Sequence, residues 1–463
     1  MCKGRRIIWY SSMTEPGNPS SITLHPPHRG IHWVALLAWI FLTFPARPAG
    51  FRFPLEQGKF YRLEGTTNAD SWTVLEPAIF GDAPEWVRSR SDYPAAIREV
   101  RLVQESVVDL NPTLEKLRAK HGVPALAAIL VRSNRVIAAG AVGIRVHGSE
   151  VPVEMGDLWH QGSITKSMTA TLAGILVDEG RIHWTSTLGQ ILGPRVPGMH
   201  EDWRDVTLGQ LLRHRSGAPD HDELVRNKIW DAIWNQRGPM SGRRLHWLTA
   251  VTTNPPPTAP GTRFVYSNTG YVFAGMMLEQ VSGQPWEDLL RTRLFLPLGM
   301  HTAGFGPPAT RGHTNQPWGH EWIHGKPSGI PPGRNADNPQ SLGPAGTVHG
   351  SLFDLAKYLM FHARPAEAEG VRLVSPETFQ RLHEAPAGES YAFGWHVMNR
   401  AWASGDVLHH TGSNTQWFSN AWIAPGKQAA LIAVTNIGDG SGKKAFNVTD
   451  EALSRMIANH VGR

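Results

Sequence analysis

The sequence contains almost no cysteine. Cys2 is the single cysteine among 463 residues, and it lies in an N-terminal segment that we expect to be removed or unstructured. One thiol cannot form a disulfide framework or a cysteine-based metal site within one chain. A chain of this length can bury about three-quarters of its unfolded surface, so it does not need such cross-links. The scarcity of thiols also fits an oxidising compartment.

The chain also lacks blocks of like charge. It has 45 Lys and Arg against 39 Asp and Glu, which gives a net charge of +6, and these residues are scattered along the sequence. A nucleic-acid-binding surface needs clustered cations. We therefore expect no nucleic-acid partner, and a small-molecule or peptide substrate instead.

Long apolar runs are missing as well, and a membrane-spanning helix needs about 20 such residues. The run 31–44 is mostly apolar and follows Arg29, which is typical of the core of a signal peptide. We predict that residues 1–50 are a targeting segment and that the protein is periplasmic or secreted, with no stable membrane span after processing. A retained membrane anchor is the alternative.

What the sequence does contain is a Ser and a Lys three residues apart, Ser163 and Lys166, before a long apolar-periodic segment. On a helix, positions i and i+3 share a face, so the Lys amine can lie beside the Ser hydroxyl. A serine hydroxyl is a poor nucleophile at neutral pH and needs an adjacent base. The pattern predicts a helix that begins at Ser163 and ends at Glu179, with Gly180 as its C-terminal stop. An N-cap Ser followed by a surface Lys would look the same.

Two later motifs supply groups that this pair lacks. Tyr266-x-Asn268 offers a phenol for proton transfer and an amide for orienting a substrate. His410-Thr411-Gly412 follows a strand-like run and offers an imidazole at a strand end. Taken singly, Tyr266 and His410 are also compatible with ordinary strand positions, and Asn268 with a turn.

Together the three ordered motifs resemble the active-site set of the serine β-lactamase and penicillin-binding-protein superfamily. The Tyr-x-Asn form is similar to class C β-lactamases and to the related D-alanyl-D-alanine carboxypeptidases and esterases. The resemblance covers about 108–463. Further matching blocks are Leu211–Gly217, Pro260-Gly261, Pro297–Met300 and Gly343–Gly346.

The resemblance implies catalysis through an acyl-enzyme, with no cofactor and no metal. Ser163 would be the nucleophile, and Lys166 and Tyr266 would share the proton transfers. Asn268 would orient the substrate and the Lys side chain. A helix that begins at the nucleophile would also direct backbone N–H groups at developing negative charge.

The same resemblance places His410, Thr411 and Gly412 on a strand that lines the substrate cleft. Gly412 would permit close approach of a substrate backbone. The backbone N–H of Ser413, with that of Ser163, would form the oxyanion hole. His410 stands where many β-lactamases have Lys, which favours peptidase or esterase chemistry over lactam hydrolysis.

A rival motif is present at His320-Glu321-Trp322-Ile323-His324, which spells the zinc-protease pattern H-E-x-x-H. That pattern needs a helix, so that both His side chains face one metal ion. Gly319, Gly325 and nearby prolines bracket the motif, so we expect no long helix and no metal site there.

The order of the elements predicts an α+β fold, in which an antiparallel sheet is flanked by helices and carries an inserted α-rich lobe at about 186–345. The catalytic domain would span 108–463, after an N-terminal extension at 51–107. The expected helices are 110–121, 163–179, 207–214, 270–282, 351–361 and 446–460. The expected strands are 125–132, 136–146, 391–399, 407–410, 416–424 and 429–436.

We therefore expect a serine hydrolase that acts through an acyl-enzyme on amide or ester bonds, with D-alanyl peptides or small esters as substrates. The alternatives are a true β-lactamase and a non-hydrolytic penicillin-recognising domain. The chain lacks G-x-S-x-G, so the nucleophile elbow of an α/β-hydrolase is not available.

Overall fold

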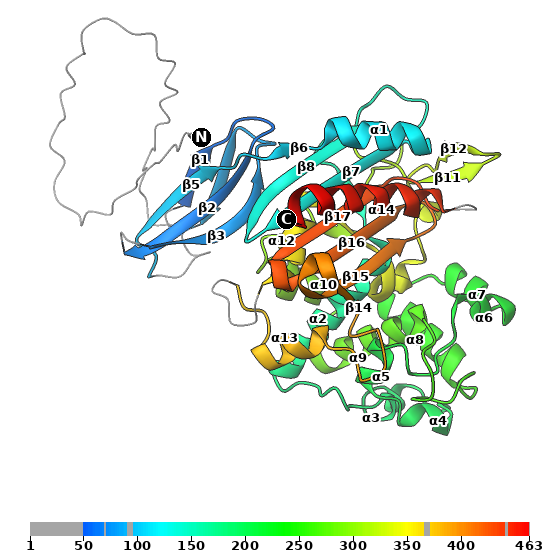
Figure 1. Ribbon diagram of the computed structural model, residues 1–463. Coiled ribbons are helices and arrows are strands. Elements are labelled where there is room, and N and C mark those ends of the chain that lie inside the picture. Colours follow the sequence, from blue (N-terminus) through cyan, green and yellow to red (C-terminus); the bar gives the residue numbers. More distant parts are fainter. Residues whose placement is uncertain (1–49, 69–70, 90–95, 365–370, 440–442, 463) are drawn as a thin grey trace, which may run out of the picture. The chain divides into compact units, whose positions relative to one another are not determined.

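The computed structural model describes residues 50–68, 71–89, 96–364, 371–439 and 443–462 (Figure 1). The chain divides into two compact units, Met1–Ser106 and Val107–Arg463. The predicted targeting segment lies outside the described residues except for its last residue. None of the helices in the described ranges is both long enough and apolar enough to cross a membrane.

The described part of the first unit is built of strands. The sheet pairs are β1 (Gly50–Pro54) with β4 (Glu85–Ser89), and β2 (Phe60–Asn68) with both β3 (Ser71–Phe80) and β5 (Glu99–Gln104). All of these pairs are antiparallel. The unit has its own core, which includes Leu63, Ile79, Trp86 and Val100.

The second unit contains a seven-stranded sheet. Its strands, in spatial order, are β14 (His396–Arg400), β15 (Gly405–Ser413), β16 (Phe418–Ala424), β17 (Ala429–Thr435), β7 (Ala125–Arg132), β8 (Arg135–Gly143) and β6 (Val108–Asp109). Neighbours are antiparallel except β6 and β8. Ser133 and Asn134 both have positive φ, which suits the two-residue turn between β7 and β8. This sheet and its helices confirm the predicted α+β class.

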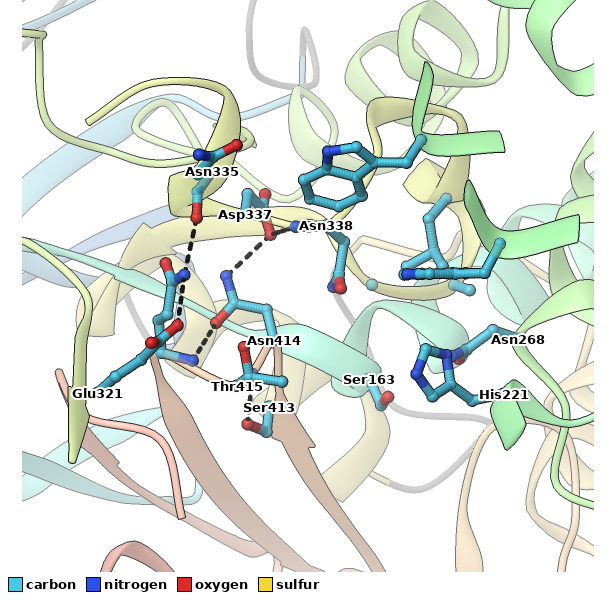
Figure 2. Close-up of a pocket in the computed structure, with 16 residues that line it drawn as sticks. Ser163, His221, Asn268, Glu321, Asn335, Asp337, Asn338, Ser413, Asn414 and Thr415 are labelled. Atoms are coloured by element: carbon cyan, nitrogen blue, oxygen red, sulfur yellow. Dashed lines mark hydrogen bonds between the residues drawn. The ribbon is translucent and has the colours of Figure 1, made fainter. Parts of the chain in front are cut away.

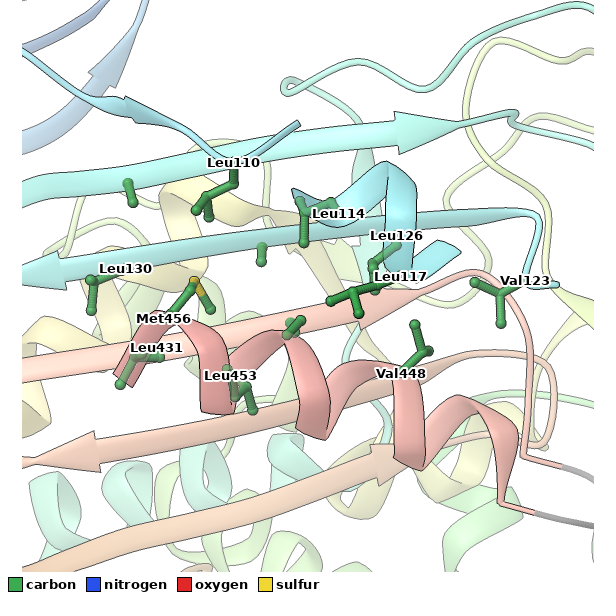
Figure 3. Close-up of a cluster of buried hydrophobic side chains, with 14 of the residues drawn as sticks. Leu110, Leu114, Leu117, Val123, Leu126, Leu130, Leu431, Val448, Leu453 and Met456 are labelled. Atoms are coloured by element: carbon green, nitrogen blue, oxygen red, sulfur yellow. The ribbon is translucent and has the colours of Figure 1, made fainter. Parts of the chain in front are cut away.

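Two helices pack against this sheet and form a large apolar core with it (Figure 3). They are α1 (Asn111–His121) and α14 (Lys444–Met456). Leu114 and Leu453 from the helices meet Leu431 of the sheet in this core. Burying one such Leu fully stabilises the fold by roughly 1.5–3 kcal/mol. Helix α12 (Leu352–Ala363) also packs against strands β17 and β7.

The inserted segment is richer in short helices than in long ones. They are α3 (Leu188–Ile191), α4 (Glu201–Arg204), α5 (Leu208–Leu212), α6 (His221–Arg226), α7 (Ile229–Asn235), α8 (Met240–Thr252), α9 (Asn268–Ser282), α10 (Trp286–Leu290) and α11 (Gly343–Gly346). The segment also contains a β-hairpin of β11 (His320–Ile323) and β12 (Lys326–Gly329). Capping boxes at Thr187 and Thr207 start α3 and α5.

The strands predicted at 136–146 and 416–424 are each a few residues shorter in the structure, and the one at 391–399 differs most. The run 391–399 was expected to be a single strand, but β14 begins only at His396. Gly394 has φ of 83°, and a Cβ there would lie 2.4 Å from the Cα of Ser167. The backbone therefore turns sharply against helix α2 (Thr165–Asp178) before the strand can begin.

Candidate active site

Ser163 lies in a tight turn that joins the sheet region to helix α2. The turn is a 3-10 helix, Gly162–Ile164, and α2 follows it directly, so the predicted helix begins with a tighter first turn. Gly162 has φ of 48°, and a Cβ there would lie 2.3 Å from the backbone nitrogen of Ser413. Only glycine allows the turn to approach the end of strand β15 so closely. At its other end α2 stops at Gly180, with φ of 69°, as predicted.

The Lys166 amine makes three short polar contacts. Its Nζ lies 2.9 Å from Ser163 Oγ, 2.7 Å from Asn268 Oδ1 and 2.7 Å from the backbone oxygen of Ala345. Lys166 is fully buried, and this burial holds the pKa of its amine well below the ordinary value for Lys. The geometry therefore combines a serine hydroxyl with an amine that favours its neutral form.

Helix α2 is held beside the segment that carries Ala345. Thr169 Oγ1 donates to the backbone oxygen of Pro344 at 2.7 Å, and Trp286 Nε1 donates to Thr169 Oγ1 at 3.1 Å. The backbone N–H of Val348 donates to Thr165 Oγ1. These bonds fix the distance between Lys166 and its backbone acceptor.

Tyr266 and Asn268 lie on either side of Ser267, which caps helix α9. Ser267 Oγ accepts from the backbone N–H of Gly270, so the helix begins at Asn268 and directs its amide toward Lys166. The Tyr266 hydroxyl hydrogen-bonds Ser163, but burial outweighs that bond and raises the pKa of Tyr266 well above its usual value. Its ring lies 4.9 Å from Lys166 Nζ.

His214 supports this turn. It lies in the matching block Leu211–Gly217, but the sequence predicts no role for it. Its Nδ1 accepts from the backbone N–H of Ser267 at 3.0 Å, and its ring lies 4.3 Å from the ring of Tyr266. Burial, with the nearby Lys166 and His410, lowers the pKa of His214 well below its ordinary value. His214 is therefore a neutral acceptor that holds the Tyr266 turn in place.

The strand motif lies on β15, beside the turn that carries Ser163. A Cβ on Gly412 would lie 1.9 Å from the backbone oxygen of Gln161, so this glycine makes room for the protein's own backbone. The ring of His410 is buried, and its Nε2 lies 3.2 Å from the Tyr391 hydroxyl. Burial and the nearby Lys166 lower the pKa of His410 well below its usual value. Its imidazole is therefore neutral near pH 7.

A cavity of about 420 Å³ opens above Ser163 (Figure 2). Of the predicted site residues, Ser163, Asn268 and Ser413 line it, whereas Lys166, Tyr266, His410, Thr411 and Gly412 do not. The other lining residues are His221, Trp230, Trp234, Glu321, Asn335, Asp337, Asn338, Leu342, Ala345, Gly346, Asn414, Thr415 and Gln416. In Figure 2, Ser163 lies between Glu321 on one side and His221 on the other.

The H-E-x-x-H segment does not form a helix, as expected. His320 begins strand β11, and His324 lies in the turn after it with φ of 49°. Both ring nitrogens of His320 are engaged: Nδ1 lies 2.7 Å from the backbone oxygen of Asn436, and Nε2 accepts from the backbone N–H of His147. The Glu of the motif instead lines the cavity that contains Ser163.

Known proteins resemble the part of this chain that contains Ser163. The family model described as Beta-lactamase matches residues 110–453. Penicillin-binding protein 4 of Amycolatopsis lactamdurans is 28% identical over 340 residues, which cover 70% of this chain and 84% of that protein. Several other relatives match over less than half of their own length.

Solved structures share the fold. An octameric penicillin-binding protein homologue from Pyrococcus abyssi has a TM-score of 0.60 at 23% identity, covering 75% of this chain and 77% of that one. A D-amino acid amidase from Ochrobactrum anthropi SV3, complexed with L-phenylalanine amide, has a TM-score of 0.59 at 22% identity, covering 75% and 97%. With the family match and the paired Ser163 and Lys166, the chain belongs to the Beta-lactamase family and is a serine hydrolase of that fold.

Proposed function

We propose that the protein hydrolyses amide or ester bonds of small aminoacyl or peptide substrates through an acyl-enzyme on Ser163. The observation that carries this proposal is the hydrogen-bonding of Lys166. A neutral amine has two N–H donors and one lone pair. The side-chain oxygen of Asn268 and the backbone oxygen of Ala345 can only accept, so they take both donors. The lone pair is left for the Ser163 hydroxyl, which Lys166 can deprotonate.

Acylation then follows with a balanced set of proton transfers. Ser163 Oγ attacks the carbonyl carbon while its proton moves to Lys166 Nζ, and the carbonyl oxygen becomes an oxyanion. The high pKa of Tyr266 keeps its hydroxyl protonated, so it can donate to the departing amine or alkoxide. The proton on Lys166 then restores Tyr266. A water molecule repeats the sequence on the acyl-enzyme and releases the acid.

The oxyanion would be held by the backbone N–H groups of Ser163 and Ser413. The close approach of Gly162 to Ser413 supports this role, because it places the backbone nitrogen of Ser413 beside the turn that carries Ser163. Removing one donor of an oxyanion hole typically costs about 2.7–4 kcal/mol of transition-state stabilisation.

The cavity lining supports a substrate with an apolar group. Trp230 and Trp234 on helix α7 line one part of the cavity. Aromatic walls with a few polar groups are typical of small-molecule sites. A preference for peptides or esters over lactams fits the neutral, buried His410, which cannot replace a Lys cation. Export to the periplasm or the medium, directed by residues 1–50, is part of the same proposal.

A side-by-side turnover assay tests the proposal. The substrates are a chromogenic cephalosporin, a p-nitrophenyl ester, a D-Ala-D-Ala peptide and D-phenylalanine amide, with Ser163→Ala as the control. We expect turnover of the ester and of at least one amide, and stoichiometric labelling of Ser163 by a fluorophosphonate. Rapid turnover of the cephalosporin alone would identify a β-lactamase, and acylation without release would identify a penicillin-recognising domain.

A further inference from the structure

The cavity above Ser163 carries two carboxylates and no Lys or Arg among its lining residues. We propose that one of them, Glu321, makes the enzyme selective for substrates with an ammonium group, namely amides or esters of amino acids whose amino group is free. This inference rests on the proposed function and names the substrate class of the same site. It also gives a role to the Glu of the H-E-x-x-H segment.

Both oxygens of the second carboxylate, Asp337, are hydrogen-bonded to other groups of the protein. Asn414 Nδ2 donates to it at 2.8 Å, and the backbone N–H of Asn338 donates at 2.7 Å. His160 Nδ1 accepts from the backbone N–H of Gly162, so the proton of this ring lies on Nε2 and points at Asp337, 3.0 Å away. Asp337 therefore holds the cavity wall and the nucleophile turn together.

The carboxylate of Glu321 has fewer hydrogen-bond partners than that of Asp337. Its Oε1 accepts from Gln416 Nε2 at 3.1 Å, and Glu321 makes no ion pair with a Lys, Arg or His within the described ranges. Its other carboxylate oxygen has no hydrogen-bond donor within the described ranges. The side chain is half-buried at the cavity wall (Figure 2). An anion in this position has one oxygen available for a donor from the substrate.

The backbone on either side of His320 fixes Glu321 in place. The backbone N–H of His320 donates to the oxygen of Gln416 at 3.0 Å, and its backbone oxygen accepts from Gly438 at 3.1 Å. The imidazole is bonded through both nitrogens. Glu321 is paired in the hairpin with Ser328. The negative charge is therefore positioned before a ligand arrives, which lowers the cost of binding a cation.

The rest of the cavity suits an ammonium group better than a carboxylate. An ammonium has three donors and no acceptor. Glu321 offers one acceptor, and the side-chain oxygens of Asn335 and Asn338 on the same lining can offer others. A substrate carboxylate would meet Glu321 without any Lys or Arg to offset it.

Matched substrates test the inference. D-phenylalanine p-nitroanilide and its N-acetyl derivative differ only in the charge and size at the amino group. We expect wild type to prefer the free amine by kcat/KM, and Glu321→Gln to reduce that preference about tenfold, as for loss of a charge-assisted bond. Glu150→Gln removes the same charge at an exposed position outside the cavity and should leave the preference unchanged.

A second readout does not need anilide turnover. Phenylalanine amide and N-acetylphenylalanine amide are compared as competitive inhibitors of p-nitrophenyl acetate hydrolysis. Stronger inhibition by the free amine, weakened in Glu321→Gln, supports the inference. Equal inhibition by both amides, or a preference that Glu321→Gln leaves intact, overturns it. If Ser163 is not labelled by a fluorophosphonate and the ester is not hydrolysed, the proposed function itself has failed.

Discussion

The catalytic centre and the cavity wall differ in the charge of their side chains. At the centre, Lys166 and His410 are buried and Tyr266 is half-buried, and desolvation moves each pKa toward the value that favours the neutral form. On the wall, Glu321 is half-buried, and only one of its carboxylate oxygens accepts a hydrogen bond from a described residue. In the proposed function, the neutral groups transfer protons and the charged group selects the substrate.

The centre can be neutral because the partners of Lys166 and of His214 Nδ1 need no charge. Lys166 faces two carbonyl oxygens, and His214 accepts a backbone N–H. A buried charged group needs opposite charges beside it. Arg244 is such a group, and its guanidinium contacts Glu279 and Glu287 at 2.5 Å each.

Removing the amine should break the centre most severely. Lys166→Ala should lower the rate of Ser163 acylation about 10³-fold, because general acid–base catalysis typically contributes 10²–10⁴-fold. The measurement is the rate of fluorophosphonate labelling. Lys116→Ala, an exposed Lys on helix α1, is the control. Labelling that survives at more than about a tenth of the wild-type rate would mean that another group is the base.

The same amine sets the acid limit of activity. Lys166 accepts a proton from Ser163 only in its neutral form, so kcat/KM should fall as pH falls through the lowered pKa of Lys166. The activity is present above that pKa and lost below it. A profile of kcat/KM for a neutral ester checks this. A limb near the ordinary pKa of Lys, about 10.4, would show that the amine is charged at neutral pH.

Replacing Arg244 tests how much the buried ion cluster stabilises the fold. Arg244→Met should lower the free energy of unfolding by about 3 kcal/mol, because it leaves Glu279 and Glu287 without their shared partner. Arg455→Met removes an exposed ion pair with Glu451 and should cost less than about 1 kcal/mol. Denaturant unfolding of both variants gives the comparison. Similar losses would show that burial does not distinguish these charges.

Removing the phenol hydroxyl separates the two halves of the proton relay. Tyr266→Phe should lower kcat/KM about 10²-fold for an amide, whose amine must be protonated to leave. A p-nitrophenyl ester, whose phenolate leaves unaided, should lose much less. Tyr271→Phe removes a hydroxyl that donates to the backbone oxygen of Leu212 in the same aromatic cluster. That control should affect both substrates alike.

The smallest effect is expected at His410. His410→Gln removes one neutral hydrogen bond to Tyr391, worth about 1 kcal/mol, so kcat/KM should fall about fivefold at most. Because the pKa of His410 is well below its usual value, the pH profiles of both proteins should run parallel between about 6 and 8. A dependence on pH in wild type that is absent in the variant would indicate a charged role for this imidazole.

Local sequence patterns predict much of this site. The spacing of Ser163 and Lys166 needs only the helix period, and Gly180 ends the helix as a left-handed cap. The acceptor at Ala345 cannot be found in this way, because its backbone oxygen meets Lys166 only through the tertiary fold. Glu321 falls in a pattern that suggests another chemistry, and only the strand geometry of β11 reassigns it.

The first unit and the inserted lobe contain elements that the sequence patterns do not predict. Strand β2 has register shifts against β3, and Ala78 takes a positive φ, so the alternation of apolar residues there is irregular. Most helices of the lobe span fewer than eight residues, which is too short for a helical period to stand out. The start signals at Thr187 and Thr207 are local, whereas the packing of these helices depends on the tertiary fold.

The two glycines beside the nucleophile restrict how the enzyme can be redesigned. A single methyl group at 412 would lie 1.9 Å from Gln161 O, and one at 162 would meet Ser413 N at 2.3 Å, so a library that randomises these positions would return glycine. Trp230, Trp234 and Glu321 line the cavity, so substitutions at these positions change its shape and polarity. Directed evolution toward new substrates should therefore sample these three positions while the reaction chemistry is inherited unchanged.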